Sequence, residues 1–413
     1  MESKDRAFLL SLQGKYNQNH WTKDESHFVF PGPFKQDKCF YIDLHTGEAF
    51  LVTDDTNSLT ADDLYQYWDL VEAADAKEVS QFVDNSVWAV KACKDCKLHP
   101  IDAIWVRKWK KLHDGTWIVK SRLCARGFLD SQSSMISTRA TTATKLSQKL
   151  LVSLANIFDL KIETWDVSGA FLKGFPFPKV REHLRQKGHV TVKRDVSIRP
   201  PDNVWRHLRE NKHCKMWIPD EHSTWWYVLD CLKSMYGLND APLAWQLVLQ
   251  DYLLGKRKGI QSQFDECFVW WMKGPGEVLS LLTCHVDDNA VASEQWWLDL
   301  EFKLFSNEFG GATRSALPFQ HCGLRYKQTA RGFCMEQDEF CQKLKPFSLT
   351  RERAQQESSS LTASELTGLR AILGGLLWLC QTRIDQICDG VGSTRCWKRS
   401  DYSHLENSQL DRY

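Results

Sequence analysis

Long apolar runs are missing from this chain of 413 residues. No run approaches the roughly 18–20 consecutive apolar residues that span a membrane. The apolar stretch behind Met1 is too short for a secretory signal peptide. The 14 cysteines are scattered along the chain, and no internal repeat is visible. We therefore expect reduced thiols in a cytosolic or nuclear protein that is neither secreted nor bound to a membrane.

A large charge of one sign is also missing, because the net charge is only +1. The chain as a whole is therefore not steered electrostatically toward nucleic acid. Its 43% hydrophobic and 25% charged residues are typical of a soluble globular protein with room for two or three subdomains. Locally, residues 91–126 hold ten Lys or Arg against three Asp. Such a stretch either binds phosphates or forms an ordinary solvated face.

A complete set of zinc ligands at a suitable spacing is missing. Cys93 and Cys96, followed by His99, form half of a possible zinc site. A structural zinc ion needs four ligands, and no second pair lies at a suitable spacing. A turn is the simpler interpretation of this segment.

Hydrophobic periodicity predicts an alternation of strands and helices. Short strands are expected at 27–30 and 39–44, with a turn at 46–48, and Thr60 is expected to begin a helix. The further elements expected are a helix at 74–83, strands at 87–90, 104–110 and 117–125 with a turn at 113–115, a helix at 146–158, helices at 245–253 and 296–309, and a helix at 366–380. Residues 175–195 are basic, and we interpret them as an irregular surface insertion.

Two adjacent carboxylates stand at the tip of an expected β-hairpin formed by residues 278–292. Asp287 and Asp288 would repel each other there unless a cation is bound, and Mg²⁺ prefers carboxylate oxygens. A second short strand, 160–167, carries Asp166 near its end. Three aspartates at strand ends can form a two-metal phosphoryl-transfer site. Most Asp-Asp pairs, however, are solvated turns.

Five sequence blocks resemble, in the same order, the reverse transcriptases of copia-type LTR retrotransposons. WDVSGAFLKG at 165–174 is similar to DVKTAFLNG of that family, and LKSMYGLNDAPLAW at 232–245 to LKKSLYGLKQAPRAW. HVDD at 285–288 stands in the place of YVDD. The segment from WVRK at 105–108 to VKSRLCARGF at 119–128 matches an upstream block, and 366–385, ending in TRID, matches one ending in TRPD. The resemblance covers roughly residues 76–395.

The resemblance implies an α+β fold of the right-hand polymerase (reverse transcriptase) type, with fingers, a ferredoxin-like palm and a helical thumb-like C-terminal part. It divides the chain into an N-terminal segment of unknown role at 1–75, fingers and palm at 76–345, and a thumb- or connection-like segment at 346–413. We expect a mixed palm sheet with helices on one face. The knuckle and protease motifs of the full polyprotein are missing, and the end comes too early for RNase H, so a fragment is expected.

The activity implied is RNA-directed DNA polymerisation, in which a nucleotidyl group passes from a dNTP to a primer 3′-hydroxyl with two metal ions. Asp166, Asp287 and Asp288, with the backbone carbonyl of Val167, would hold two Mg²⁺ or Mn²⁺ ions. Phe171 matches the aromatic gate that favours deoxynucleotides in the family. Without the resemblance it is equally well an ordinary core residue.

Further residues match positions that contact the nucleotide. Lys120 and Arg122 alternate on one strand and so share a face, and Arg122 suits phosphate best because its guanidinium is bidentate. Tyr236 and Gly237 match the lining of the nucleotide pocket, where glycine allows close backbone approach. FQHCGL at 319–324 resembles a block near the primer strand, and as a plain strand it would need no function. The partners implied are an RNA or DNA template with its primer and dNTP; the oligomeric state stays open.

Departures from the family pattern leave two hypotheses. His285 replaces a tyrosine, Asn239–Asp240 replace Lys-Gln and remove a positive charge, and Ile384 replaces a proline. None of these is a metal ligand. The first hypothesis is a working polymerase module, in a cytoplasmic retrotransposon particle or in the nucleus. The second is a degenerate retroelement relic that keeps the fold, with or without nucleic-acid binding, and no longer polymerises.

Overall fold

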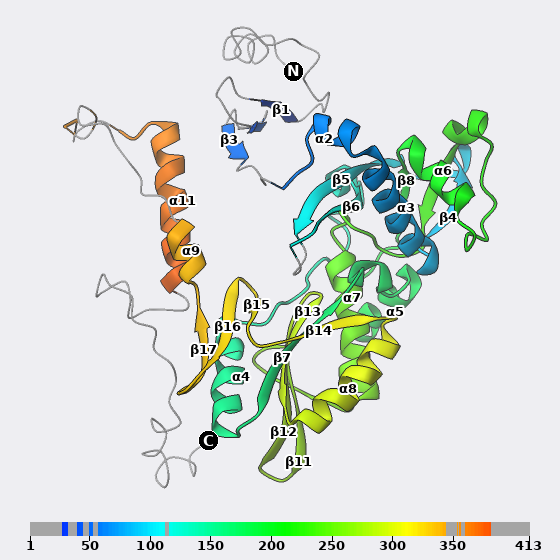
Figure 1. The fold of residues 1–413 in the computed structure, drawn as a ribbon. Coiled ribbons are helices and arrows are strands. Elements are labelled where there is room, and N and C mark those ends of the chain that lie inside the picture. Colours follow the sequence, from blue (N-terminus) through cyan, green and yellow to red (C-terminus); the bar gives the residue numbers. More distant parts are fainter. Residues whose placement is uncertain are drawn as a thin grey trace. The chain divides into compact units, whose positions relative to one another are not determined.

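The computed structural model describes residues 27–31, 39–43, 49–52, 57–111, 115–343, 353, 355–356 and 360–380, with backbone alone for the first three ranges (Figure 1). The chain forms two compact units. Unit 1 comprises 1–74, 106–122 and 358–369, and unit 2 comprises 75–105, 123–357 and 370–413. The turns expected at 46–48 and 113–115 and the TRID block lie wholly or partly outside the described residues.

Unit 1 contains a three-stranded antiparallel sheet and a short capped helix. The sheet is made of β1 (His27–Pro31), β2 (Cys39–Asp43) and β3 (Ala49–Val52) in that order. Helix α2 (Ala61–Gln66) begins with a capping box, in which Thr60 and Asp63 each accept a hydrogen bond from the other's backbone N–H. The helix start predicted at Thr60 is therefore confirmed.

The centre of unit 2 is a six-stranded antiparallel sheet. Its strands, in spatial order, are β10 (Ile260–Gln261), β11 (Phe268–Gly274), β12 (Glu277–His285), β13 (Asp288–Ser293), β7 (Lys161–Val167) and β14 (Ala312–Ala316). Every pair in this sheet is antiparallel, so the mixed palm sheet that we expected is wrong. The predicted hairpin of 278–292 is confirmed as β12 and β13.

Both faces of this sheet are covered, whereas helices were expected on one face only. Trp165 and Val291 point into a core with α7 (Ala241–Gln250), the π-helical turn η6 (Asp251–Lys256) and α8 (Gln295–Glu308). Ile162 and Ala292 point into a second core with α4 (Lys145–Ile157), and Figure 1 shows α4 and α8 on opposite sides of β7. Because strand residues alternate between faces, the continuous apolar run of β12 already implied two buried faces.

A three-stranded sheet joins α4 in the second core. It consists of β15 (Phe319–His321), β16 (Leu324–Thr329) and β17 (Gly332–Glu336), and it contributes Phe319, Leu324 and Tyr326 to the same cluster. The segment 319–324, expected as one strand, is therefore split by a turn between β15 and β16.

Residues 175–195 are not an irregular insertion, as we expected. They contain helix α5 (Phe177–Gln186), whose Phe177, Val180 and Leu184 are buried. These residues are spaced by three and four, so they lie on one face of the helix. Val180 and Leu184 pack against α7. The basic side chains between them concealed this apolar stripe in the sequence.

A five-stranded mixed sheet has the order β4 (Trp88–Ala92), β9 (Tyr227–Cys231), β8 (Ser197–Arg199), β5 (Ile101–Lys111) and β6 (Trp117–Ala125). β5 and β8 are parallel, and the chain runs through β5 and β6 from one unit into the other. The other helices and 3₁₀ turns are α3 (Trp68–Asp84), α6 (Asp202–Glu210), η2 (Cys93–Asp95), η3 (Gly127–Leu129), η4 (Ala170–Lys173) and η5 (Glu221–Trp226).

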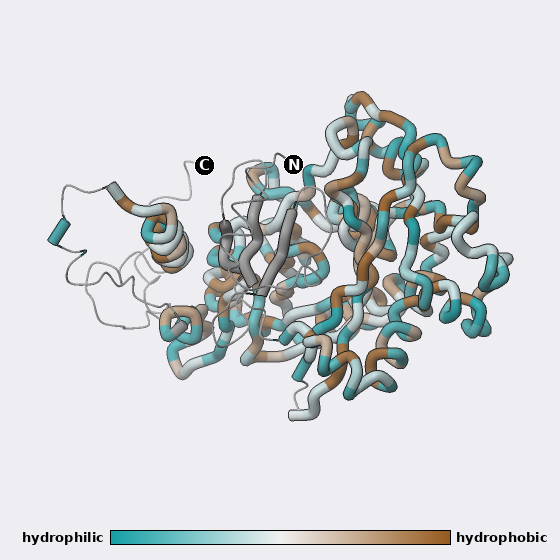
Figure 2. Tube along the Cα trace, turned by 90° about the horizontal axis from the view of Figure 1, so that it is seen from above, coloured by the Kyte–Doolittle hydropathy of each residue, from teal (hydrophilic) through white to brown (hydrophobic). Residues whose placement is uncertain are grey.

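Two helices follow β17, namely α9 (Asp338–Lys343) and α11 (Ala363–Cys380). α11 starts earlier than the predicted 366 because Thr362 and Glu365 form a capping box. No helix among the described residues has the length and apolarity needed to cross a membrane. Hydrophilic and hydrophobic residues alternate over short distances along most of the tube in Figure 2.

Asp265, a buried aspartate, connects α4 to the residues that precede β11. Asp265 accepts hydrogen bonds from the hydroxyl of Ser147, from the backbone of Thr144 at 2.8 Å and from the backbone of Cys267 at 2.9 Å. Burial alone would raise the pKa of Asp265, but these hydrogen bonds outweigh it and lower the pKa below its ordinary value.

Replacement of Asp265 by Asn should lower the free energy of unfolding by about 1–3 kcal/mol at pH 7, because the donors lose a charged acceptor. A lowered native pKa stabilises the fold above the unfolded value and is lost as pH falls through the native value. The difference between wild type and variant should therefore shrink below about pH 4. Urea unfolding across pH 3–7 measures it, with Asp220→Asn as an exposed control; a pH-independent difference would contradict the assignment.

Candidate active site

Asp166 and Asp288 lie directly opposite each other on neighbouring strands. β7 and β13 pair so that Asp288 faces Asp166 and Asn289 faces Trp165. Directly opposed residues share one face of the sheet, with Cβ atoms about 4.5–5.5 Å apart. The register thus brings together two acids that the sequence places in separate segments.

The third acid, Asp287, lies in the two-residue turn that joins β12 to β13. Val286 in this turn has a φ of 60°, which is unusual for a β-branched residue and normally favours glycine at the start of such a turn. Its carbonyl accepts a hydrogen bond from the indole of Trp245 at 2.6 Å. The backbone N–H of Val167 donates to the carbonyl of Asp287 at 3.2 Å. These contacts hold a strained turn in place next to the end of β7.

The carboxylate of Asp288 has two protein partners that the sequence did not reveal. Its Oδ1 accepts a hydrogen bond from the hydroxyl of Thr164, and its Oδ2 lies 3.0 Å from Nδ1 of His321. Burial, and then the neighbouring His321, lower the pKa of His285. His285 is therefore neutral near pH 7 and does not balance the acids.

The donor atoms suit a hard cation such as Mg²⁺, which binds carboxylate oxygens. Asp166 is exposed, and Asp287 and Asp288 are half-buried. Among the described residues, the carboxylate of Asp287 has no hydrogen-bond or ion-pair partner. Within the described part of unit 2, however, no three His, Cys, Asp or Glu side chains bring ligand atoms within 4.8 Å of one another. Metal binding would therefore require the side chains to turn toward a common point.

Two aromatic rings lie close to the end of β7. After Asp166 the chain turns at Gly169, which has a φ of +69° and permits the left-handed conformation. The turn leads into η4, which carries Phe171, and the rings of Phe171 and Tyr236 lie 5.7 Å apart between centroids. Both side chains are half-buried; Phe171 packs against the core that contains Trp165, and Tyr236 packs against the core that contains Phe82.

Close packing against the backbone of Ala125 requires glycine at position 237. The φ of Gly237 is +88°, and a Cβ there would lie 1.9 Å from the carbonyl oxygen of Ala125. The neighbouring Tyr236 carbonyl accepts a hydrogen bond from Ala125 N–H at 2.8 Å. A Cβ on Gly127 would in turn lie 2.0 Å from the carbonyl oxygen of Gly237. The glycine is therefore required for the contact between this turn and the end of β6.

Lys120 and Arg122 are both exposed on β6 and alternate with buried residues. The shared face predicted for them is confirmed. They belong to unit 1, whereas the three aspartates belong to unit 2.

The segment that resembled a zinc half-site has other contacts. Cys93 Sγ contacts the carbonyl of Trp225, Cys96 Sγ contacts Ser197, and His99 Nδ1 lies 2.8 Å from the carbonyl of Pro100.

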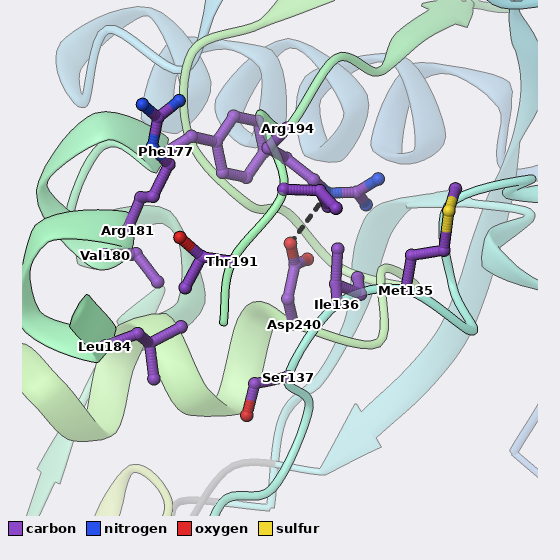
Figure 3. Close-up of a pocket in the computed structure, with 11 residues that line it drawn as sticks. Met135, Ile136, Ser137, Phe177, Val180, Arg181, Leu184, Thr191, Arg194 and Asp240 are labelled. Carbon is purple, nitrogen blue, oxygen red and sulfur yellow. Dashed lines mark hydrogen bonds and ion pairs between the residues drawn. The ribbon is translucent and has the colours of Figure 1, made fainter. Parts of the chain in front are cut away.

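Asp240, which replaces a glutamine of the family pattern, is buried in an ion-pair network. It lies 2.8 Å from Arg194, whose guanidinium also binds Asp130 at 2.6 Å. Figure 3 shows Arg194 and Asp240 paired at a small pocket that is also lined by Phe177 and Leu184 of α5. The negative charge of Asp240 is therefore compensated by Arg194, which lies in the segment that we had interpreted as an irregular insertion.

Replacement of Trp245 by Phe should lower the free energy of unfolding by about 1–3 kcal/mol, because the Val286 carbonyl loses its donor and the ring volume shrinks. The chemical denaturation midpoint measures this change. Trp296→Phe is the matched control, since Trp296 is 55% exposed and should change stability by no more than about 0.5 kcal/mol. Equal effects of the two substitutions would argue against a special role for the Trp245 hydrogen bond.

Comparison with known proteins gives limited similarity. No family model matches the chain. Among solved structures, a foamy viral protease-reverse transcriptase in complex with double-stranded DNA is 13% identical, with a TM-score of 0.32 over 98% of this chain and 67% of that chain. A second foamy viral protease-reverse transcriptase, also with double-stranded DNA, is 13% identical with a TM-score of 0.32 over 92% of this chain and 67% of the other. TM-scores this low do not assign a fold.

Proposed function

We propose that this chain is a polymerase module that transfers a nucleotidyl group from a dNTP to a primer 3′-hydroxyl, as an RNA-directed DNA polymerase of the copia type. The observation that carries the proposal is the pairing of Asp166 with Asp288 on adjacent strands, with Asp287 in the turn beside them. The order of the five sequence blocks supports it independently.

The aspartates would serve as oxygen ligands. Asp166, Asp287 and Asp288 would hold two Mg²⁺ ions, with the carbonyl of Val167 as a further ligand. Bound metal would lower the pKa of the primer hydroxyl and neutralise the charge of the triphosphate and of the pyrophosphate that leaves. The backbone contacts of the turn would keep Asp287 beside the end of β7 in the absence of metal.

Other residues would bind the nucleotide. Phe171, supported by Tyr236, would place a ring below the sugar and clash with a 2′-hydroxyl. Lys120 and Arg122 would bind the triphosphate, where a bidentate guanidinium is well matched to phosphate oxygens. Because Gly237 has no side chain, a nucleotide could approach the backbone of this turn closely. The partners would be a primed RNA or DNA template and dNTP.

One observation favours the second candidate, a folded relic without polymerase activity. No three His, Cys, Asp or Glu side chains bring ligand atoms together within the described part of unit 2. In the relic, the contacts of Asp288 with Thr164 and His321 would be purely structural, and the acids would bind no metal. Metal binding and primer extension separate the two candidates.

The purified chain should extend oligo(dT) on poly(rA) with Mg²⁺ or Mn²⁺, and the Asp287→Asn/Asp288→Asn variant should not, because two anionic ligands are lost. Primer extension on a sequencing gel measures this. Asp220→Asn/Asp251→Asn removes two carboxylates outside the site and should retain activity. A folded wild-type chain that extends no primer would sink the polymerase assignment and leave the relic.

Replacement of Phe171 by Ala should weaken discrimination against ribonucleotides. A clash relieved by loss of the ring is worth about 1–3 kcal/mol, or roughly tenfold or more in the ratio of kcat/KM for dNTP and rNTP. Phe175→Ala is the matched control, because Phe175 instead stacks on His183. Unchanged discrimination in Phe171→Ala would exclude the gate.

A further inference from the structure

The carboxylate of Asp288 is contacted by two buried side chains. Its side chain is 28% exposed, whereas the His321 side chain beside it is fully buried. Thr164, which donates to the other carboxylate oxygen, is itself only 8% exposed. Both partners come from elements that enclose the acid, Thr164 from β7 and His321 from β15. The two oxygens are thus contacted on the side away from solvent.

His321 has no other evident use for its polar atoms. Both ring nitrogens are buried without a hydrogen bond to the described residues. The imidazole ring packs edge-to-face against the rings of Tyr326 and His285, with centroid distances of 5.8 and 6.5 Å. A buried polar group without a partner is destabilising. The acceptor in reach of Nδ1 is Oδ2 of Asp288.

We propose that Thr164 and His321 are positioning residues that fix the carboxylate of Asp288 for a divalent metal ion. This inference rests on the proposed function, since it assigns Asp288 to a metal. An ionised carboxylate offers about four lone-pair sites. Two protein donors therefore leave lone pairs on the exposed side for a metal. Metal-binding carboxylates are commonly hydrogen-bonded in this way, and loss of the donors typically weakens metal affinity about tenfold to a hundredfold.

The chain offers a matched control for the hydroxyl. Thr283 lies on β12, is completely buried, and its Oγ1 has no hydrogen-bond partner among the described residues. Thr164→Val and Thr283→Val each remove one buried hydroxyl from the same sheet without changing side-chain shape. Only the first removes a donor to Asp288.

The experiment is a Mn²⁺ titration of the full chain, followed by electron paramagnetic resonance of the free ion, with thermal unfolding as a check on folding. Thr164→Val and His321→Leu should raise the dissociation constant about tenfold or more. Thr164→Ser and His321→Asn, which keep a donor at the same position, should bind within about threefold of wild type. Thr283→Val should bind like wild type.

The outcomes separate this inference from the proposed function. Wild-type affinity in folded Thr164→Val and His321→Leu would overturn the positioning role and leave the polymerase assignment standing. Weakened Mn²⁺ binding in both, rescued by Ser and Asn, would support the role even if the wild-type chain extends no primer. A wild-type chain that binds no Mn²⁺, or binds it equally well after Asp287→Asn/Asp288→Asn, would overturn both.

Discussion

The candidate site depends on the register between β7 and β13. Asp166 faces Asp288 only while Ile162 faces Ala292 and Glu163 faces Val291. A slip by one residue would exchange the two faces of a strand. Such a slip is strongly disfavoured here because both faces are buried, with Trp165 and Val291 in one core and Ile162 and Ala292 in the other. Packing along the strands therefore sets where the carboxylates meet at their ends.

The hairpin tip depends on a different set of forces. A valine in the left-handed region is strained, and the side chain of Val286 packs against the core that contains Trp165 and Trp245. The hydrogen bond from Trp245 and the contact of Asn289 Nδ2 with the carbonyl of Asp287 at 3.2 Å fix the turn from within the protein. Trp245 is itself completely buried. The position of Asp287 is therefore linked to the packing of α7, which also supports α5.

Local patterns in the sequence were sufficient for most single elements. The hairpin of β12 and β13, the amphipathic α4 and the capping box at Thr60 follow from periodicity and short-range hydrogen bonds. Partners distant in the sequence were not predictable in this way. Arg194 was assigned to an irregular segment because its acids, Asp130 and Asp240, lie elsewhere in the chain.

The same limit applies to the site. The three aspartates could be identified from their positions at strand ends and from the family resemblance. Thr164 could have been found from alternation, since it lies two residues before Asp166 and so shares its face. His321 carried no local signal, because it reaches Asp288 only through the packing of the β15–β17 sheet on the second core.

Charge compensation distinguishes this hairpin from Glu163 and Glu301, two buried acids of unit 2. Glu163 meets Arg314 at 2.7 Å, and Glu301 meets Arg257 at 2.6 Å. Asp287 and Asp288 have no arginine or lysine partner among the described residues, and their neighbour His285 is neutral near pH 7. Two adjacent carboxylates at a turn, opposite a third, would repel one another when all three are ionised. A divalent cation would remove that repulsion, which is the physical basis for preferring a metal site over a solvated turn.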